Sequence, residues 1–264
     1  MNYDIAHVPE RTNFPRKDGL TMVMDKGLSL RQAEDFLEGS HQLVDLVKLG
    51  FGSSLITPKL EEKIAIYREA KVRVYFGGTL FEAFIARNDF DGYRKFIDKY
   101  QLDLCEVSDG SISISGDLKC DYIRRLAKDY TVLSEVGSKE EGILISPGKW
   151  IKMMKTELEA GSWKVIAEAR ESGTVGIYRP NGSAHSVLIN KILNKVKAEN
   201  ILWEAPKKAQ QVYFIKLIGA NVNLGNIAPE EAMALECLRL GLRGDTFFQF
   251  LPEEISQQLT QKVS

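Results

Sequence analysis

The chain of 264 residues is long enough for one large domain or two small ones, and its 44% hydrophobic and 27% charged residues are typical of a soluble globular protein. A formal net charge of −1 provides no overall field for binding nucleic acid or an anionic membrane, so we expect neither as a partner. The sequence shows no signal peptide, no apolar run approaching the ~20 residues of a membrane span, and three widely spaced cysteines without metal-binding spacing, which together predict a reduced, cytoplasmic protein.

The N-terminal residues 1–19 are polar and are predicted to form an arm rather than a core element. From Leu20 onward, short apolar runs alternate with segments of helical periodicity, and glycine, proline and serine mark their boundaries. The apolar runs predict strands at 20–24, 41–49, 72–76, 102–107, 131–136, 163–167, 201–203 and 221–224. The periodic segments predict helices at 29–38, 58–70, 81–100 with an interruption near Asn88, 117–129, 147–160, 183–198, 206–218 and 229–240.

Eight strand–helix units in a chain of 264 residues match a (β/α)8 barrel, which takes roughly 250 residues. We therefore predict an α/β protein with a single (β/α)8 TIM-type barrel at 20–250, a short N-terminal arm at 1–19 and a C-terminal tail at 251–264. An open, doubly wound sheet is the alternative, because it shares the same alternation of elements. The chain has no linker and no change in composition between its halves, which favours the closed barrel.

Carboxylates gather at the ends of the predicted strands, which in a barrel is the catalytic end. Glu106, Glu135, Glu168 and Glu204 each follow an apolar strand residue by two positions, so strand alternation points all four to one face. Asp25 closes the first strand. Carboxylates crowded around one axis repel each other unless a cation compensates them. Because Mg²⁺ combines a few carboxylate ligands with water and substrate oxygens, these five acids predict a Mg²⁺ site.

Basic residues share the same end of the predicted barrel. Lys26, Lys48 and Arg170 follow the first, second and sixth strands, where they suit a substrate carboxylate or phosphate. Lys48 takes the place of an apolar residue at the end of a buried run, so it requires a partner. The alternative is a structural network in which these three cations neutralise the acids without a metal.

Residues near the predicted eighth strand add candidate phosphate contacts, because barrels often bind phosphate after strands seven and eight. These residues are Asn223, Gly225 and Asn226. Arg243 follows the last long helix and is either structural or able to close over the same rim. The chain contains no G-x-S-x-G, P-loop or H-E-x-x-H motif, and its three histidines lie away from the catalytic end. Proton transfer therefore falls to lysine or a carboxylic acid.

The segments at these strand ends resemble those of phosphosulfolactate synthase. They are GLTMVMDKG at 19–27, VKLGFGS at 47–53, GGTLFE at 77–82, EVSDGS at 106–111, SEVG at 134–137, ARESG at 169–173, EAPKKAQQ at 204–211 and LRGDTF at 242–247. The resemblance implies a Mg²⁺-dependent barrel that adds sulfite to phosphoenolpyruvate and gives (2R)-3-phosphosulfolactate, on a route to coenzyme M in archaea or to sulfolactate in some bacteria. It also implies that Lys139 is the catalytic acid that protonates C2, and it suggests a homo-oligomer such as a trimer.

Two departures from the family pattern concern the rim. Ala169 stands where a glycine is expected, and the loop after Lys139 is shorter than in archaeal members. Neither change removes a charged group. Two other functions stay open: a non-enzymatic barrel similar to the heat-stress-associated plant branch of the family, and a lyase that combines phosphoenolpyruvate with another nucleophile.

Overall fold

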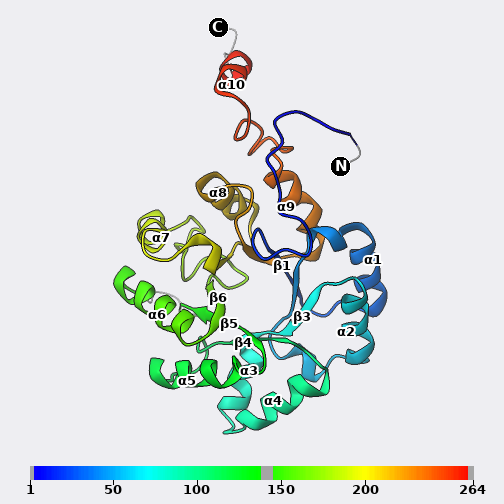
Figure 1. Cartoon of the computed structure of the whole chain (residues 1–264), viewed down its shortest axis with the longest axis vertical. Helices are drawn as coiled ribbons and strands as arrows, with labels where there is room; N and C mark the ends of the chain where they lie inside the picture. The colour runs from blue at the N-terminus through cyan, green and yellow to red at the C-terminus, as the bar shows by residue number, and fades with distance from the viewer. Residues whose placement is uncertain (1–2, 138–144, 261–264) are drawn as a thin grey trace.

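The computed structural model describes residues 3–137 and 145–260. Eight parallel strands pair in the order β3-β2-β1-β8-β7-β6-β5-β4, and β3 packs against β4, so the sheet is a nearly closed barrel (Figure 1). The predicted barrel is therefore confirmed, and the open sheet is wrong. The strands are β1 (Thr21–Asp25), β2 (Leu46–Leu49), β3 (Arg73–Phe76), β4 (Leu104–Val107), β5 (Thr131–Val136), β6 (Ser162–Ala167), β7 (Ile201–Glu204) and β8 (Leu224–Ile227).

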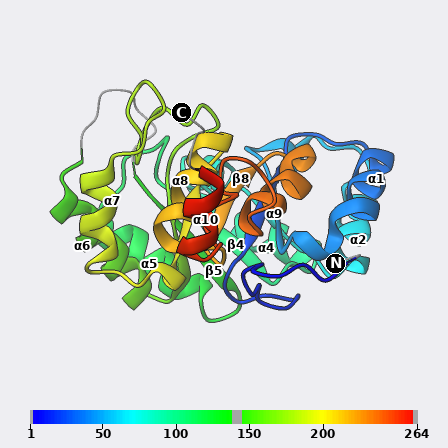
Figure 2. The same cartoon turned by 90° about the horizontal axis from the view of Figure 1, so that it is seen from above.

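Helices surround the barrel (Figures 1 and 2), and the last helix extends away from it beyond α9 (Figure 1). They are α1 (Leu30–Ser40), α2 (Leu60–Glu69), α3 (Gly78–Ile85), α4 (Phe90–Lys99), α5 (Gly116–Leu126), α6 (Pro147–Glu159), α7 (Ser186–Leu193), α8 (Lys208–Ile218), α9 (Ala232–Arg239) and α10 (Glu253–Thr260). Local sequence sets their starts: Ser29 forms a capping box with Gln32, and Ser146 caps α6 ahead of Pro147. Within the described ranges, none of the helices combines the length and apolar character needed to span a membrane.

Two apolar clusters show which way each strand residue points. The larger one fills the layer between the strands and the helices. The smaller one fills the barrel interior and contains Leu20, Met22, Leu46, Tyr75, Leu104, Leu133, Ile166 and Leu202. Because strand side chains alternate, the next inward position after each of these residues lies nearer the carboxyl end of the barrel. The inward-facing strand residues thus form the core of the barrel, and the inward-facing positions that follow them face the site at its carboxyl end.

The eighth strand begins three residues later than the sequence predicts. The pair Gly225-Asn226 has the composition of a turn, but here it forms a bulge inside β8. Thr21 pairs with Leu224 and Val23 pairs with Ile227, so β8 has one more residue than β1 between these two pairs. Within this bulge Asn226 has a φ of +56°. The predicted second strand also shortens, since His41–Leu43 forms a 3₁₀ turn before β2.

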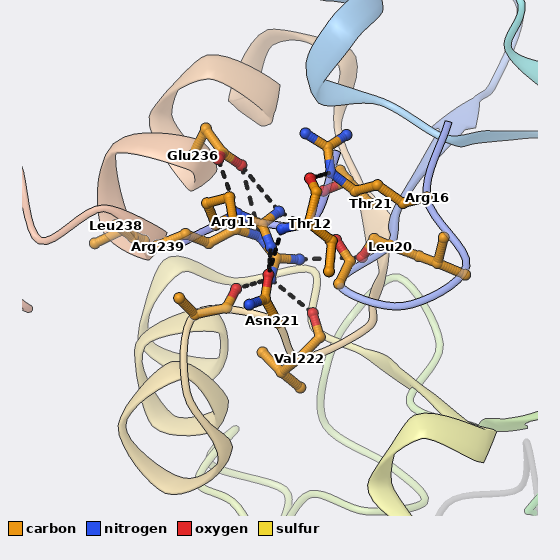
Figure 3. Close-up of polar contacts among 12 residues, drawn as sticks. Arg11, Thr12, Arg16, Leu20, Thr21, Asn221, Val222, Glu236, Leu238 and Arg239 are labelled. Atoms are coloured by element: carbon orange, nitrogen blue, oxygen red, sulfur yellow. Dashed lines mark hydrogen bonds and ion pairs between the residues drawn. The ribbon is translucent and has the colours of Figure 1, made fainter. Parts of the chain in front are cut away.

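The N-terminal arm lies across the amino end of the barrel, beside α9 (Figure 3). Arg11 forms an ion pair with Glu236 at 2.9 Å, and its guanidinium also donates to the side-chain oxygen of Asn221. The backbone nitrogen of Thr12 donates to the same Asn221 oxygen at 3.2 Å. Beneath these contacts Arg239 is fully buried and donates to three backbone carbonyls, at 2.6 Å to Ala220 and to Val222 and at 3.0 Å to Leu20. The arm is thus fixed to α9 and to the segment that precedes β8.

Candidate active site

A pocket of about 410 Å³ opens at the carboxyl ends of the strands. It is lined by Met24, Lys48, Phe51, Thr79, Ser111, Glu135, Glu168, Arg170, Glu171, Ser172, Glu204 and Asn226. A larger groove of about 800 Å³ lies between the arm and helices α1 and α2. The smaller pocket is the better candidate site, because buried charged groups converge on it and active sites of barrels form at this end.

Three glutamates and Lys48 line the floor of the pocket, and Glu106 contacts Lys48 without lining the pocket; all five residues are nearly completely buried. The Lys48 Nζ lies 3.0 Å from Glu106 Oε1, 3.5 Å from Glu135 Oε2 and 3.7 Å from Glu204 Oε1. One carboxylate oxygen from each of Glu135, Glu168 and Glu204 lies within 4.8 Å of the other two. The structure therefore brings together the four glutamates whose strand positions predict a common face, and it places Lys48 among them.

The charges of this cluster depend on one another. Burial opposes the charge on Lys48, but the carboxylates of Glu106 and Glu135 outweigh that effect and raise the pKa of the lysine well above its ordinary value. Burial raises the pKa of Glu204 to about 7, with Lys48 opposing this rise and Glu135 adding to it. The cluster thus holds more negative than positive groups in a buried place, which is an arrangement that favours an additional cation.

Backbone amides at the strand ends hold three of these carboxylates in place. Gly78 donates to Glu106 at 2.7 Å, Ala169 to Glu204 at 2.9 Å, and Arg170 to Glu168 at 2.5 Å. Position 78 has to be glycine, because a Cβ there would lie 2.4 Å from the Ser108 side chain and 2.5 Å from the Glu106 carboxylate. The carboxylates are therefore oriented before any ligand binds.

A second group of residues supports Glu135 from outside the pocket, and strand patterns alone do not reveal it. Ser108 Oγ lies 2.8 Å from Glu135 Oε1 and 2.5 Å from a carboxylate oxygen of Glu82. Glu82 also accepts from the backbone nitrogens of Gly110 at 2.8 Å and Ser111 at 3.1 Å, which shapes the loop after β4. The available signal was a glutamate within the otherwise apolar helix GTLFEAFI, where a buried charge requires partners.

Of the predicted substrate contacts, Arg170 and Asn226 line the pocket together with Lys48. Asn226 is only 7% exposed, and its Oδ1 has no hydrogen-bond partner among the described residues. Lys26 lies beside the pocket and forms an exposed ion pair at 3.3 Å with Glu171, which does line it. Lys139, the predicted acid, falls outside the described residues.

Asp25 faces away from the pocket, contrary to the prediction. Because Met22 points into the barrel, alternation turns Asp25 outward toward helix α2. There its carboxylate lies 2.6 Å from Lys63 Nζ and accepts from the Tyr67 hydroxyl at 3.0 Å and from the backbone nitrogen of Gly27 at 2.7 Å. Asp25 therefore attaches the first loop to α2 and is not a metal ligand in this arrangement.

Three predicted substrate contacts near the end of the chain also lie elsewhere. Asn223 precedes β8, at the amino end of the barrel, where its amide bonds to Leu20, Glu199 and Ile201 backbone atoms. Gly225 packs inside the barrel, since a Cβ there would lie 2.8 Å from the Met22 side chain. Arg243 follows α9 and is not among the residues that line the pocket. The late start of β8 accounts for the misplacement of Asn223.

Comparisons with known proteins place the chain in a family. The family model described as (2R)-phospho-3-sulfolactate synthase (ComA) matches residues 9–245. A phosphosulfolactate synthase of Bacillus subtilis is 39% identical over 251 residues, covering 94% of this chain and all of that protein. One of Methanothermobacter thermautotrophicus is 41% identical over 244 residues, covering 90% of this chain and 95% of that protein.

Among solved structures, 3-hexulose-6-phosphate synthase from Salmonella typhimurium aligns with a TM-score of 0.56 and 15% identity, covering 85% of this chain and all of that one. Identity this low shows a common barrel fold and nothing about the reaction. The family match extends over most of the barrel, and the two sequence relatives align over nearly their whole length. The chain therefore belongs to the (2R)-phospho-3-sulfolactate synthase family, a family of enzymes.

Proposed function

We propose that this protein is a phosphosulfolactate synthase that adds sulfite to phosphoenolpyruvate and gives (2R)-3-phosphosulfolactate. The observation that carries the proposal is the buried cluster of Lys48 and four glutamates, of which Lys48 and three glutamates line the same pocket as Arg170 and Asn226. It supplies negative groups for a cation next to donors for an anion, as a small, multiply charged substrate requires. The names of the two relatives support the same activity.

Mg²⁺ is the proposed cofactor, and Glu135, Glu168 and Glu204 are its proposed ligands. Oxygens that share one Mg²⁺ at about 2.1 Å lie at most about 4.2 Å apart. The observed limit of 4.8 Å is close to this value, so small side-chain movements suffice. All three ligands are hard oxygen donors, which suits Mg²⁺. When bound, the ion would polarise substrate oxygens and offset negative charge that develops on them.

The residues of the chain have distinct proposed roles. Arg170 and Asn226 hold the phosphate or carboxylate of phosphoenolpyruvate. Lys48 faces the substrate and offsets the negative charge of the glutamates around it. As sulfite attacks C3, negative charge spreads toward the carboxylate, where these donors stabilise it. Lys139 then delivers a proton to C2, which completes the addition. The free thiols of the three cysteines support a reducing compartment, and we infer a cytoplasmic protein that forms homo-oligomers.

Purified protein incubated with Mg²⁺, phosphoenolpyruvate and sulfite is expected to consume sulfite and form a phosphorylated sulfonate. Loss of sulfite and appearance of the product by phosphorus NMR measure this directly. Reactions without Mg²⁺, or with a chelator, serve as controls and are expected to be inactive. Phosphoenolpyruvate binding without sulfite turnover would indicate another nucleophile. Neither binding nor turnover by the folded protein would favour a non-enzymatic barrel.

Lys139→Ala is expected to lower kcat by about 100-fold or more while leaving phosphoenolpyruvate affinity nearly unchanged, because a positioned acid contributes about 10² to 10⁴ in rate. Single-turnover rates and calorimetric titration with phosphoenolpyruvate separate the two effects. Lys149→Ala, an exposed lysine at the start of α6, is the matched control. An unchanged kcat in Lys139→Ala would remove this lysine as the acid.

A further inference from the structure

Two of the residues that line the pocket are apolar. Among the described residues that line it, Met24 and Phe51 carry apolar side chains, and the others carry polar or charged groups. Met24 is 6% exposed at the end of β1, and Phe51 is 45% exposed in the loop after β2. Gly50, which precedes Phe51, packs closely against Met24, since a Cβ at position 50 would lie 3.3 Å from the Met24 Cγ. We refer to Met24 and Phe51 as the apolar wall.

The backbone of Phe51 is held in an unusual conformation. Its φ is +57°, a region that bulky residues rarely adopt. Phe51 occupies the first central position of a turn closed by a 3.2 Å hydrogen bond from the Ser53 nitrogen to the Gly50 carbonyl. Lys71 and Gln101 also have a positive φ, but each lies two residues beyond the last residue of a helix, where this conformation commonly ends a helix. Phe51 ends no helix, so that explanation fails for it.

Two other residues that line the pocket also have a positive φ, whereas His7 and Lys59 have it elsewhere in the chain. Arg170 and Asn226 have φ values of +53° and +56°, and they line the same pocket as Phe51. A half-exposed phenylalanine contributes little to the core, and glycine would adopt the same φ without strain. Its presence in a left-handed position facing the pocket is therefore better explained by a contact with substrate than by folding.

On the basis of the proposed function, we propose that Phe51 is a specificity-determining residue that packs against the carbon end of phosphoenolpyruvate and limits the substituent that C3 can carry. The substrate has two anionic groups, which Arg170, Asn226 and a cation held by the three glutamates would attract to the polar side. Its apolar part, the CH₂ carbon with its double bond, is left to face the apolar wall. A methyl group on C3 would then collide with the Phe51 ring.

The test compares phosphoenolpyruvate with its Z-3-methyl analogue, phosphoenol-2-oxobutyrate, as substrates for sulfite addition. Wild-type protein is expected to prefer phosphoenolpyruvate, and Phe51→Ala is expected to reduce that preference in kcat/KM by at least about 10-fold, since one methyl group in a tight pocket is worth roughly 10- to 200-fold. The loss for phosphoenolpyruvate itself is expected mainly in KM. Leu55→Ala, at a 55% exposed residue of the same loop that does not line the pocket, is the control and is expected to behave as wild type.

A second measurement requires no substrate. Phe51→Gly is expected to keep or raise the midpoint of thermal unfolding, because glycine adopts a positive φ freely. A clear fall in that midpoint would show that Phe51 is a structural anchor and would overturn the proposal. An unchanged preference between the two substrates in Phe51→Ala would overturn it equally.

The proposal and the proposed function can fail separately. If wild-type protein turns over sulfite but Phe51→Ala keeps the wild-type preference, the function stands and the role of Phe51 falls. If wild-type protein binds phosphoenolpyruvate without sulfite turnover, the ratio of Kd values for the two enolpyruvates in wild type and Phe51→Ala decides the role of Phe51. If wild-type protein binds neither enolpyruvate, both proposals are overturned.

Discussion

Lys48→Met is expected to lower the free energy of unfolding of the metal-free protein by about 3–5 kcal/mol, the usual cost of removing one partner from a buried ion pair. The lysine Nζ lies within 3.7 Å of three carboxylates that are almost inaccessible to water. Methionine has a similar length but no charge, so the carboxylates lose their compensating cation while packing changes little. Urea denaturation in the presence of a chelator measures the loss.

The same variant separates the two cations that the proposed site requires. With Lys48 gone, Mg²⁺ is expected to bind more tightly and to restore stability, because ligands that bind only the folded state stabilise it. Glu168→Gln is expected to have the opposite effect and to weaken Mg²⁺ binding.

Lys48→Met is also expected to lose about 10³-fold in kcat/KM through weaker binding of the anionic transition state. Lys59→Met, at an exposed lysine, is the control. Full stability of metal-free Lys48→Met would contradict the buried network.

Arg239→Met is expected to destabilise the protein by about 4–5 kcal/mol, which is near the lower end of what three hydrogen bonds from a charged donor contribute at about 1.5–3 kcal/mol each. Burial, reinforced by Arg11, lowers the pKa of Arg239 to about 9, with Glu236 opposing the fall. The protein tolerates this buried cation because its guanidinium reaches the carbonyls of Ala220, Val222 and Leu20, which methionine would leave without a donor.

Equilibrium denaturation compares Arg239→Met with wild-type protein and with Arg124→Met, a control at an exposed arginine of α5. Arg239→Lys is expected to recover only part of the loss, because one ammonium does not match the geometry of the guanidinium fork. A loss below about 1 kcal/mol, the size of an ordinary hydrogen bond, would mean that water replaces the three bonds at little cost.

Much of the fold and the floor of the site follow from local patterns. Alternating strand and helix signals predict the barrel, and period-2 alternation from Leu104 and Leu202 places Glu106 and Glu204 on the inner face. Lys48 was recognisable as a charge in an apolar run. These features depend on neighbours in sequence, so a single chain suffices to find them.

The remaining features depend on contacts between distant segments. Asp25 pairs with Lys63 on α2. The sequence does not predict this contact, because every residue of β1 is buried and its pattern does not show to which side Asp25 points. The Gly225-Asn226 pair is typical of a turn in the sequence, and only the pairing of β1 with β8 shows that it forms a bulge. Glu82 reaches Ser108 from a different strand–helix unit, so no local spacing reveals their contact.

The contacts of Arg239 also determine when the barrel can close. The bond to the Leu20 carbonyl joins residues 219 positions apart, and the arm residue Arg11 reaches Glu236 across 225 positions. During synthesis, at roughly 5–20 residues per second, β1 has no β8 beside it until nearly the whole chain has emerged. Until then the open edge of β1 is available to other chains. We expect truncation before β8 to cause aggregation more readily than loss of the extended C-terminal helix α10.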